Sequence, residues 1–172
     1  NYSSARYDYS NAIRLDSLNS IYHFLHGLAC IKLGIQKQDL EYVKEAIKDY
    51  TKAIRLDDHN AEFFLNRAEA IFILKDYEAA EADYSKAIQL GLDNALTYLK
   101  RGNTKWQLQD LVGAIADYDK SIELDSTFAA AYSNRGFLKV KGGDESNGCT
   151  DLKKAVSLGS KNASETLLKY CK

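Results

Sequence analysis

Residues 46–57 read Ala46-Ile-Lys-Asp-Tyr-Thr-Lys-Ala-Ile-Arg-Leu-Asp57, and related copies of this segment occur four more times along the chain. The other copies span residues 5–16, 80–91, 114–125 and, with more changes, 148–159. The leucines near the ends of the copies follow one another at steps of 41, 34, 34 and 34 residues: Leu15, Leu56, Leu90, Leu124 and Leu158. A fixed period of this length is typical of one supersecondary unit stacked on copies of itself. The sequence therefore predicts a repeat protein, and it favours a binding role over catalysis.

A second helical pattern lies between successive copies, as in residues 61–74 and 95–108. We expect each repeat to consist of a helix A, a short turn and a helix B, with the recurring segment in helix B. Aspartates stand where helix B should begin and can cap its free amides, while glycines stand where it should end in a left-handed cap. These are Asp76, Asp110 and Asp144 at the starts, and Gly91 and Gly159 at the ends.

Small residues recur at fixed places on both helices. They allow close approach of two antiparallel helices, and a tyrosine of helix B should fill the wider gap beside each contact. The small residues are Gly27, Ala68, Gly102 and Gly136 on helix A and Ala46, Ala80 and Ala114 on helix B, and the tyrosines are Tyr50, Tyr84 and Tyr118.

The small residue of helix A and the alanines and aromatic residue of helix B resemble the pattern of the tetratricopeptide repeat (TPR) family. The resemblance covers the whole chain, although the proline that commonly follows helix B is missing. It implies an all-α fold, a right-handed α-solenoid (superhelix) of antiparallel helix pairs in a single domain, 1–172. We expect a half repeat at 1–16, a repeat with a seven-residue insertion at 17–57, repeats at 58–91 and 92–125, a degenerate repeat at 126–159 and a capping helix at 160–172.

The seven extra residues lie within residues 34–46. Seven residues make about two helical turns, so we expect helices A and B to grow by about one turn each, with Asp39 as the cap of helix B. A longer loop is the alternative. At the end of the chain, Ala163, Leu167 and Tyr170 give the last helix one apolar face, as a terminal cap needs. This favours a genuine C-terminus, whereas the chain lacks methionine and enters on a lone helix B, which indicates a trimmed N-terminal side.

The composition and motif content of the chain argue against several classes of function. The net charge is -1 with 27% charged residues, so neither a nucleic-acid-binding surface nor a polybasic membrane patch is indicated. No apolar run approaches the roughly 18–20 residues of a membrane span. No phosphate-binding loop, nucleophile elbow or metal-binding histidine pair is present, so we expect no enzyme activity, no catalytic residues, no cofactor and no metal.

Each copy of helix B carries an aspartate directly before its aromatic position, and a basic or ionisable group follows 18 residues later. We interpret these as ion pairs between helix B of one repeat and helix A of the next, rather than as acid–base groups. The aspartates are Asp8, Asp49, Asp83, Asp117 and Asp151, and the partners are His26, Arg67, Arg101, Arg135 and Lys169. His23, His26 and His59 are otherwise interpreted as ordinary surface or interface residues.

The three cysteines are Cys30, Cys149 and Cys171. Without a Cys-x-x-Cys pair or a nearby histidine, they do not indicate a zinc site. Cys149 should lie on the last helix B and Cys171 on the helix that folds over it, so a Cys149–Cys171 disulfide is a hypothesis, with free thiols as the alternative. The chain would then work in an oxidising compartment, periplasmic or secreted, and otherwise in the cytoplasm.

In the TPR family the A helices line a concave groove that holds peptides or helices of partner proteins. The resemblance implies a lining of Phe24, Leu28, Leu65, Asn66, Glu69, Phe72, Leu99, Lys100, Asn103, Trp106, Asn134, Phe137 and Lys141. Asn66, Lys100 and Asn134 share one register and could hold a peptide backbone, while Trp106 and Phe137 could anchor an apolar side chain. The alternative is that the asparagines cap local structure and Trp106 packs inside.

Chaperone-binding members of the family grip a terminal carboxylate with a lysine and two asparagines. Asn103 and Asn134 occupy suitable positions, but Leu99 stands where the first lysine belongs, so we do not expect this carboxylate clamp. The leading hypothesis is a non-catalytic module that binds a protein or peptide partner. The alternatives are a self-association module acting through its N-terminal end, and the recruiting arm of a larger enzyme whose catalytic domain lies upstream.

Overall fold

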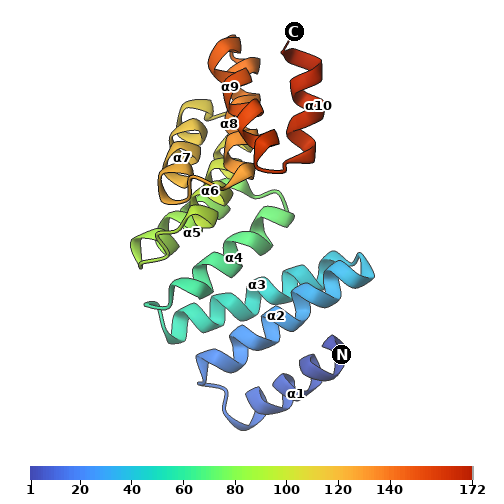
Figure 1. Ribbon diagram of the computed structural model, residues 1–172. Helices are drawn as coiled ribbons and strands as arrows, with labels where there is room; N and C mark the ends of the chain where they lie inside the picture. The colour runs from blue at the N-terminus through green and yellow to red at the C-terminus, as the bar shows by residue number, and fades with distance from the viewer. Residues whose placement is uncertain (172) are drawn as a thin grey trace. The chain divides into compact units, whose positions relative to one another are not determined.

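The computed structural model describes residues 1–171, which are all-α, with no strand in this range (Figure 1). Lys172, the last residue of the expected capping segment, lies outside the described residues. The helices are α1 (Tyr2–Leu15), α2 (Ser20–Lys37), α3 (Leu40–Leu56), α4 (Ala61–Ile73), α5 (Tyr77–Gln89), α6 (Ala95–Gln107), α7 (Leu111–Leu124), α8 (Ala129–Lys141), α9 (Glu145–Ser157) and α10 (Lys161–Tyr170).

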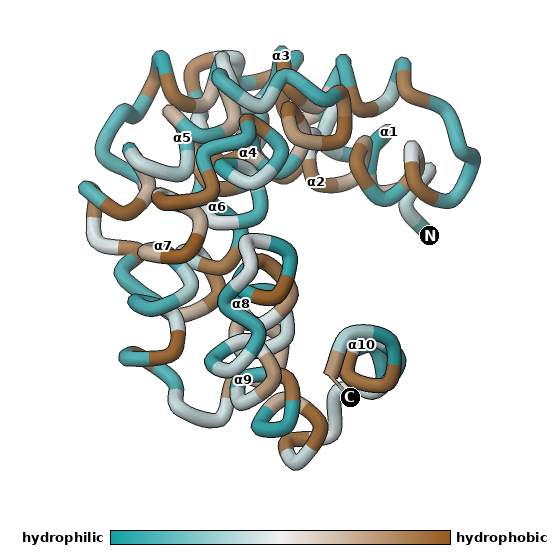
Figure 2. The backbone as a smooth tube through the Cα atoms, turned by 90° about the horizontal axis from the view of Figure 1, so that it is seen from above, coloured by the Kyte–Doolittle hydropathy of each residue, from teal (hydrophilic) through white to brown (hydrophobic). Residues whose placement is uncertain are grey.

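The expected all-α repeat fold is confirmed. α2, α4, α6 and α8 occupy the helix A positions and α3, α5, α7 and α9 the helix B positions. Hydrophobic and hydrophilic residues alternate around each helix (Figure 2), as burial of one helix face requires. No helix of residues 1–171 combines the length and the apolar character that crossing a lipid bilayer demands.

The predicted helix caps are also confirmed. The side chains of Asp76, Asp110 and Asp144 each accept a hydrogen bond from the backbone amide three residues later. Gly91 and Gly159 have φ angles of 104° and 91°, the left-handed conformation that residues with a Cβ atom rarely adopt. Local sequence signals therefore set where these helices begin and end.

The chain falls into two compact units, Asn1–Leu92 with α1 to α5 and Asp93–Lys172 with α6 to α10. In the first unit, one core gathers Cys30, Val43, Ala46, Tyr50 and Ala70, and a smaller one gathers Ala68, Ala80 and Tyr84. In the second unit, the cores are Leu99, Ala114, Tyr118, Ala131 and Leu138, and then Leu152, Ala155 and Ala163.

The insertion lengthens both helices of the first hairpin. α2 has 18 residues and α3 has 17, against 13 in each of α4 and α5. Asp39 caps α3 by accepting a hydrogen bond from the Glu41 amide, so helix B begins at Leu40 and not after Val43. The expectation of about one extra turn in each helix is therefore confirmed, and the longer-loop alternative is wrong.

Glycine allows the close contact between α6 and α7. A Cβ atom placed on Gly102 would lie 2.7 Å from Cε1 of Tyr118, and one on Gly27 would lie 2.6 Å from Cε1 of Tyr50 in the longer hairpin. Both tyrosines are fully buried. Each tyrosine ring therefore occupies the volume that a side chain on the facing helix would need.

The last helix is held to the second unit by packing and by a covalent bond. Ala163 is fully buried, and Leu167 and Cys171 pack against the core beneath α9. Cys149 on α9 and Cys171 form a disulfide with 5.7 Å between their Cα atoms, while Cys30 is a buried free thiol. The disulfide joins α9 to the residue that follows α10.

Candidate functional site

In the second unit, two asparagines of the helix A face are hydrogen-bonded to each other. Asn134 Nδ2 of α8 donates to Asn103 Oδ1 of α6 at 2.7 Å, and the buried Tyr118 hydroxyl donates to the same oxygen at 2.8 Å. Among the hydrogen bonds of the described residues, none reaches Asn103 Nδ2 or Asn134 Oδ1. The pair is thus fixed by α7 from behind, and it leaves an amide donor and a carbonyl acceptor without a protein partner.

An aromatic cluster lies on the same two helices. The rings of Trp106 on α6 and Phe137 on α8 meet edge to face with centroids 5.5 Å apart, and Tyr170 of α10 approaches Phe137 at 6.4 Å. Lys141 Nζ lies 5.9 Å from the Phe137 ring centre and 5.0 Å from that of Tyr170. All three rings are half-buried, and those of Trp106 and Phe137 also pack against the core of the second unit. Their edges and the lysine therefore offer an apolar contact beside a positive charge.

The helix A residues expected to line a groove in the first unit are engaged in packing. Phe24 stacks against Tyr50 and Phe63, with ring centres 5.8 and 5.0 Å away, and Leu28 packs against the same core. Leu65 and Phe72 pack against the Ala68, Ala80 and Tyr84 core.

The polar residues proposed for the first unit are also bound locally or half-buried. Asn66 donates to the Glu62 carbonyl of its own helix at 2.8 Å. This is the local role that was the alternative interpretation of the asparagines. Glu69 is half-buried on α4.

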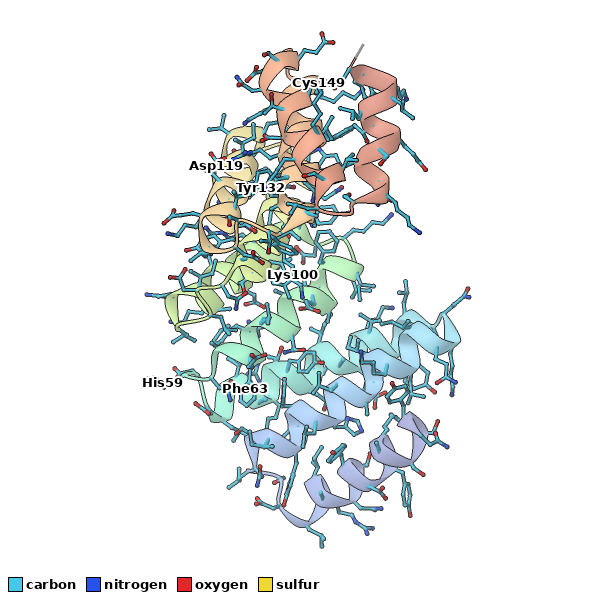
Figure 3. All side chains as sticks on the ribbon, in the orientation of Figure 1. His59, Phe63, Lys100, Asp119, Tyr132 and Cys149 are labelled. Atoms are coloured by element: carbon cyan, nitrogen blue, oxygen red, sulfur yellow. A yellow bond between two sulfur atoms is a disulfide. The ribbon has the colours of Figure 1, made fainter. Side chains whose placement is uncertain are left out.

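Leu99 requires a correction. It is only 8% exposed and belongs to the core of the second unit, because its side chain faces Tyr118 and Ala114 rather than solvent. Leu99 is therefore not retained as a contact residue. Lys100, the next residue on α6 (Figure 3), is half-buried.

From Asp49 onward the repeated ion pairs form inside each repeat, so the sequence prediction named the wrong partners. Each of these four aspartates binds the basic or ionisable residue that precedes it on helix A of its own repeat. Arg135 also binds Asp119 of α7, in the preceding repeat, at 2.6 Å. The Asp8–His26 and Asp151–Lys169 pairs are not formed within residues 1–171. The observed pairs are His26–Asp49 at 2.7 Å, Arg67–Asp83 at 2.7 Å, Arg101–Asp117 at 2.6 Å and Arg135–Asp151 at 2.5 Å.

The cause lies in the helix contact. The basic residue directly precedes the small residue of helix A, and the aspartate directly precedes the tyrosine of helix B, or Leu152 in the last repeat. Because the small residue touches that tyrosine, the two charged side chains are brought together at the same place.

Two of the three histidines also differ from expectation. His23 and His26 are 8% and 5% exposed, and His26 Nδ1 lies 3.8 Å from the sulfur of Cys30. The statement that no histidine lies near a cysteine is therefore wrong. The signal was present in the sequence, because residues four apart on a helix lie on one face.

Ser10, His26 and Asp49 form a hydrogen-bonded row with distances of 2.9 and 2.7 Å, in the order found in serine hydrolases. The next repeat forms the same row with Thr51, Arg67 and Asp83. An arginine cannot act as a general base at neutral pH, so the row is a structural device of the repeat and not a catalytic triad.

Two cavities of the second unit lie away from the asparagine pair. One of about 630 Å³ lies along α9 and α10, beside the disulfide and Leu168. Another of about 380 Å³ lies between the start of α6 and the turn before α8, and it is lined by Leu96 and Phe128. Neither coincides with the Asn103–Asn134 face.

Comparison with known proteins agrees with this architecture. Sequence profiles of the tetratricopeptide repeat family match residues 32–95 and 95–128, and the chain belongs to this family. No curated protein sequence matches the chain.

Solved structures with the same fold include the crystal structure of MamA, with 24% identity, 98% of this chain and 92% of that chain covered, and a TM-score of 0.84. YrrB, described as a TPR protein with an unusual peptide-binding site, has 18% identity, coverage of 94% and 82%, and a TM-score of 0.73. The first TPR of Spaghetti (RPAP3), bound to the HSP90 peptide SRMEEVD, has 29% identity, coverage of 68% and 93%, and a TM-score of 0.59. TPR proteins of this kind are typically non-catalytic interaction modules.

Proposed function

We propose that the chain is a non-catalytic interaction module that binds an extended peptide segment of a partner protein on the helix A face of its second unit. The proposal rests on one observation: Asn103 and Asn134 hold an amide donor and a carbonyl acceptor open to solvent beside the Trp106–Phe137 pair. Peptide binding by the structurally similar YrrB and RPAP3 supports this choice of ligand class.

The chemistry of the face fits a peptide backbone. An amide side chain can donate to one peptide carbonyl and accept from one peptide N–H, whatever the side chains of the peptide. Fixing Asn103 through Tyr118 lowers the entropy that binding has to remove. The aromatic edges of Trp106 and Phe137 would bury one apolar side chain of the peptide, and Lys141 favours an acidic residue next to it.

A random peptide library displayed on phage tests the proposal with the full chain as bait. We expect the wild-type protein to enrich peptides that share an apolar residue next to an acidic one. Asn134→Ala and Trp106→Ala should lose this enrichment while both variants keep the helical circular dichroism of the wild type. Trp106→Ala should also melt at a lower temperature, because its ring packs against the core. Val112→Ser is the matched control, because Val112 is 83% exposed on α7, a helix B. Enrichment that persists in both the Asn134→Ala and the Trp106→Ala variant would contradict peptide binding on this helix A face.

Self-association is the second candidate, and a separate observation favours it. α1 has no buried residue, and Tyr7, Leu15 and Leu18 nearby are 67%, 86% and 72% exposed. Apolar surface of this kind is buried when two copies pair. Light scattering across a range of concentrations tests it: a mass that stays at 19.3 kDa excludes pairing.

A further inference from the structure

The buried aspartates of three repeats are each neutralised by permanent cations. Arg67 binds Asp83 through two nitrogens, each 2.7 Å from a carboxylate oxygen. Asp117 is bound by Arg101 and by Lys105 one turn further along α6, and Asp151 is bound by Arg135 and Lys139 in the same way. Helix A thus places positive charge at one position and, in two repeats, again four residues later. A buried carboxylate needs such a charge, because its transfer out of water is otherwise unfavourable.

The first hairpin departs from this pattern at both positions. His26 stands in place of the arginine and Cys30 stands four residues later, while His23 lies one turn earlier on the same face of α2. The carboxylate they face is Asp49 of α3, whose side chain is 15% exposed. In the described part of the chain, the ion-pair partners of Asp49 are these two histidines, at 2.7 and 3.9 Å.

Hydrogen bonds orient both imidazole rings in the same sense. His23 Nε2 lies 3.0 Å from the Ser17 carbonyl, which can only accept, so this nitrogen carries the proton and Nδ1 faces Asp49. The Ser10 hydroxyl donates to the Arg6 carbonyl at 2.8 Å, so it accepts from His26 Nε2, and His26 Nδ1 faces Asp49 at 2.7 Å. In the metal-free protein a proton on His26 Nδ1 completes the hydrogen bond to Asp49. Once that proton is lost, the Nδ1 lone pair faces the carboxylate, and a metal ion can take the place of the proton.

We propose that His26, Cys30 and Asp49 form a binding site for one divalent transition-metal ion of the zinc class, with His23 beside the Asp49 carboxylate. The donor atoms of His26, Cys30 and Asp49 all lie within 4.8 Å of one another. Ligands around tetrahedral zinc are about 3.3–3.8 Å apart, from bond lengths of about 2.0–2.3 Å. The 3.8 Å between His26 Nδ1 and the Cys30 sulfur is already at this spacing, and the Asp49 carboxylate has to move away from His26 by less than about 1 Å.

The charges of the filled site also balance. A thiolate from Cys30 and the Asp49 carboxylate cancel the two charges of the ion, and the neutral imidazole of His26 adds none, which leaves a neutral complex inside the protein. Burial raises the pKa of the Cys30 thiol to about 12, and Glu45 and Asp49 act in the same direction. Metal binding replaces the thiol proton, which is released to solvent. Arg6 near the sulfur is itself paired with Glu45 at 2.8 Å, so the net charge around the site stays small.

The surrounding hydrogen bonds are those of an outer ligand shell. Metal-binding histidines commonly donate their second ring N–H to a carbonyl or another oxygen, which fixes the ring. Ser10 supplies this oxygen to His26, and the Ser17 carbonyl fixes the neighbouring ring of His23 in the same way. A bound ion would tie α2 to α3 within the lengthened hairpin, in place of the guanidinium that joins the two helices of the other repeats.

Zinc binding to the full chain tests the site, and the same chain supplies a control histidine. The protein, free of any polyhistidine tag and with its disulfide intact, is dialysed against Zn²⁺ and assayed for bound metal. Co²⁺ is used in parallel, because a cobalt–thiolate bond gives a charge-transfer absorption. We expect one ion per chain and a thiolate band for the wild-type protein.

Three variants locate the ion. His26→Arg restores the ion pair of the other repeats, and Cys30→Ala removes the sulfur. Each should weaken Zn²⁺ binding by more than about 100-fold, since even outer-shell partners are worth about 10–100-fold. His59→Arg removes an exposed histidine on the turn between α3 and α4 (Figure 3) and should bind as the wild type does. Should His26→Arg lose its helical circular dichroism, Cys30→Ala decides alone. Absence of a bound ion, or unchanged binding in Cys30→Ala, would overturn the proposal.

Discussion

Removal of the Cys149–Cys171 disulfide should destabilise the second unit by an amount that follows from the chain length it closes. The two cysteines are 22 residues apart. A cross-link over this length removes about 11 cal/mol/K of entropy from the unfolded chain, or about 3.4 kcal/mol at 25 °C. Changes in the folded state contribute little to this loss of stability, because Ala163 and Leu167 keep α10 packed on α9 without the disulfide.

Urea unfolding of the Cys149→Ser/Cys171→Ser variant measures this loss. Trp106, the single tryptophan of the chain, lies on α6 and reports the second unit by fluorescence. With a urea dependence of about 2 kcal/mol/M, the midpoint should fall by about 1.7 M. Reduced wild-type protein is the matched control and should unfold at the same midpoint as the double variant, since both lack only the cross-link. A midpoint equal to that of the oxidised protein would refute the reasoning.

Three further outcomes are expected. Gly102→Ala should lower the free energy of unfolding by about 1–3 kcal/mol, because a hydrogen bond holds the hydroxyl of Tyr118 and its ring cannot move aside. Chemical unfolding measures this loss, and an unchanged midpoint would contradict the close contact. Arg67→Met should cost about 3–5 kcal/mol by leaving the Asp83 carboxylate buried without its partner, and a thermal melt that is not lowered would argue against a buried pair. Burial raises the pKa of three tyrosine hydroxyls in the folded protein, whereas in the unfolded chain their pKa is about 10. The stability that the neutral hydroxyls contribute is therefore complete below about pH 10. Above this pH the free energy of unfolding falls by up to about 4 kcal/mol per pH unit, since the unfolded chain loses three protons that the folded protein keeps. The three residues are Tyr50, Tyr84 and Tyr118. The ultraviolet absorbance of tyrosinate during alkaline unfolding checks this expectation, and ionisation of these tyrosines before the protein unfolds would contradict it.

The helices and their ends could be predicted from the sequence because their signals are local. An aspartate such as Asp110 caps the amides of its own helix, and a glycine such as Gly91 adopts a left-handed angle that its own lack of Cβ permits. The extra turn in α2 and α3 follows from the same kind of evidence, since seven residues fit two turns and Asp39 can begin the helix.

The partners of charged residues were harder to predict, because they depend on the register between two helices. Asp83 has Arg67 sixteen residues before it and Arg101 eighteen residues after it, and the sequence alone ranks neither. Because the small residue of helix A contacts the tyrosine of helix B, Asp83 lies beside the earlier arginine, Arg67. The burial of Leu99 and the hydrogen bond from Asn134 to Asn103 depend in the same way on packing between helices.

The disulfide described at the end of α10 limits how the second unit can open. In stacked repeats each helix is held mainly by its neighbours, so a helix can detach once its contacts with them are lost. α10 packs on α9 through Ala163 and Leu167, yet it cannot drift away when this packing is lost, because Cys171 remains bonded to α9. Full release of α10 therefore requires α9 to leave the second unit with it.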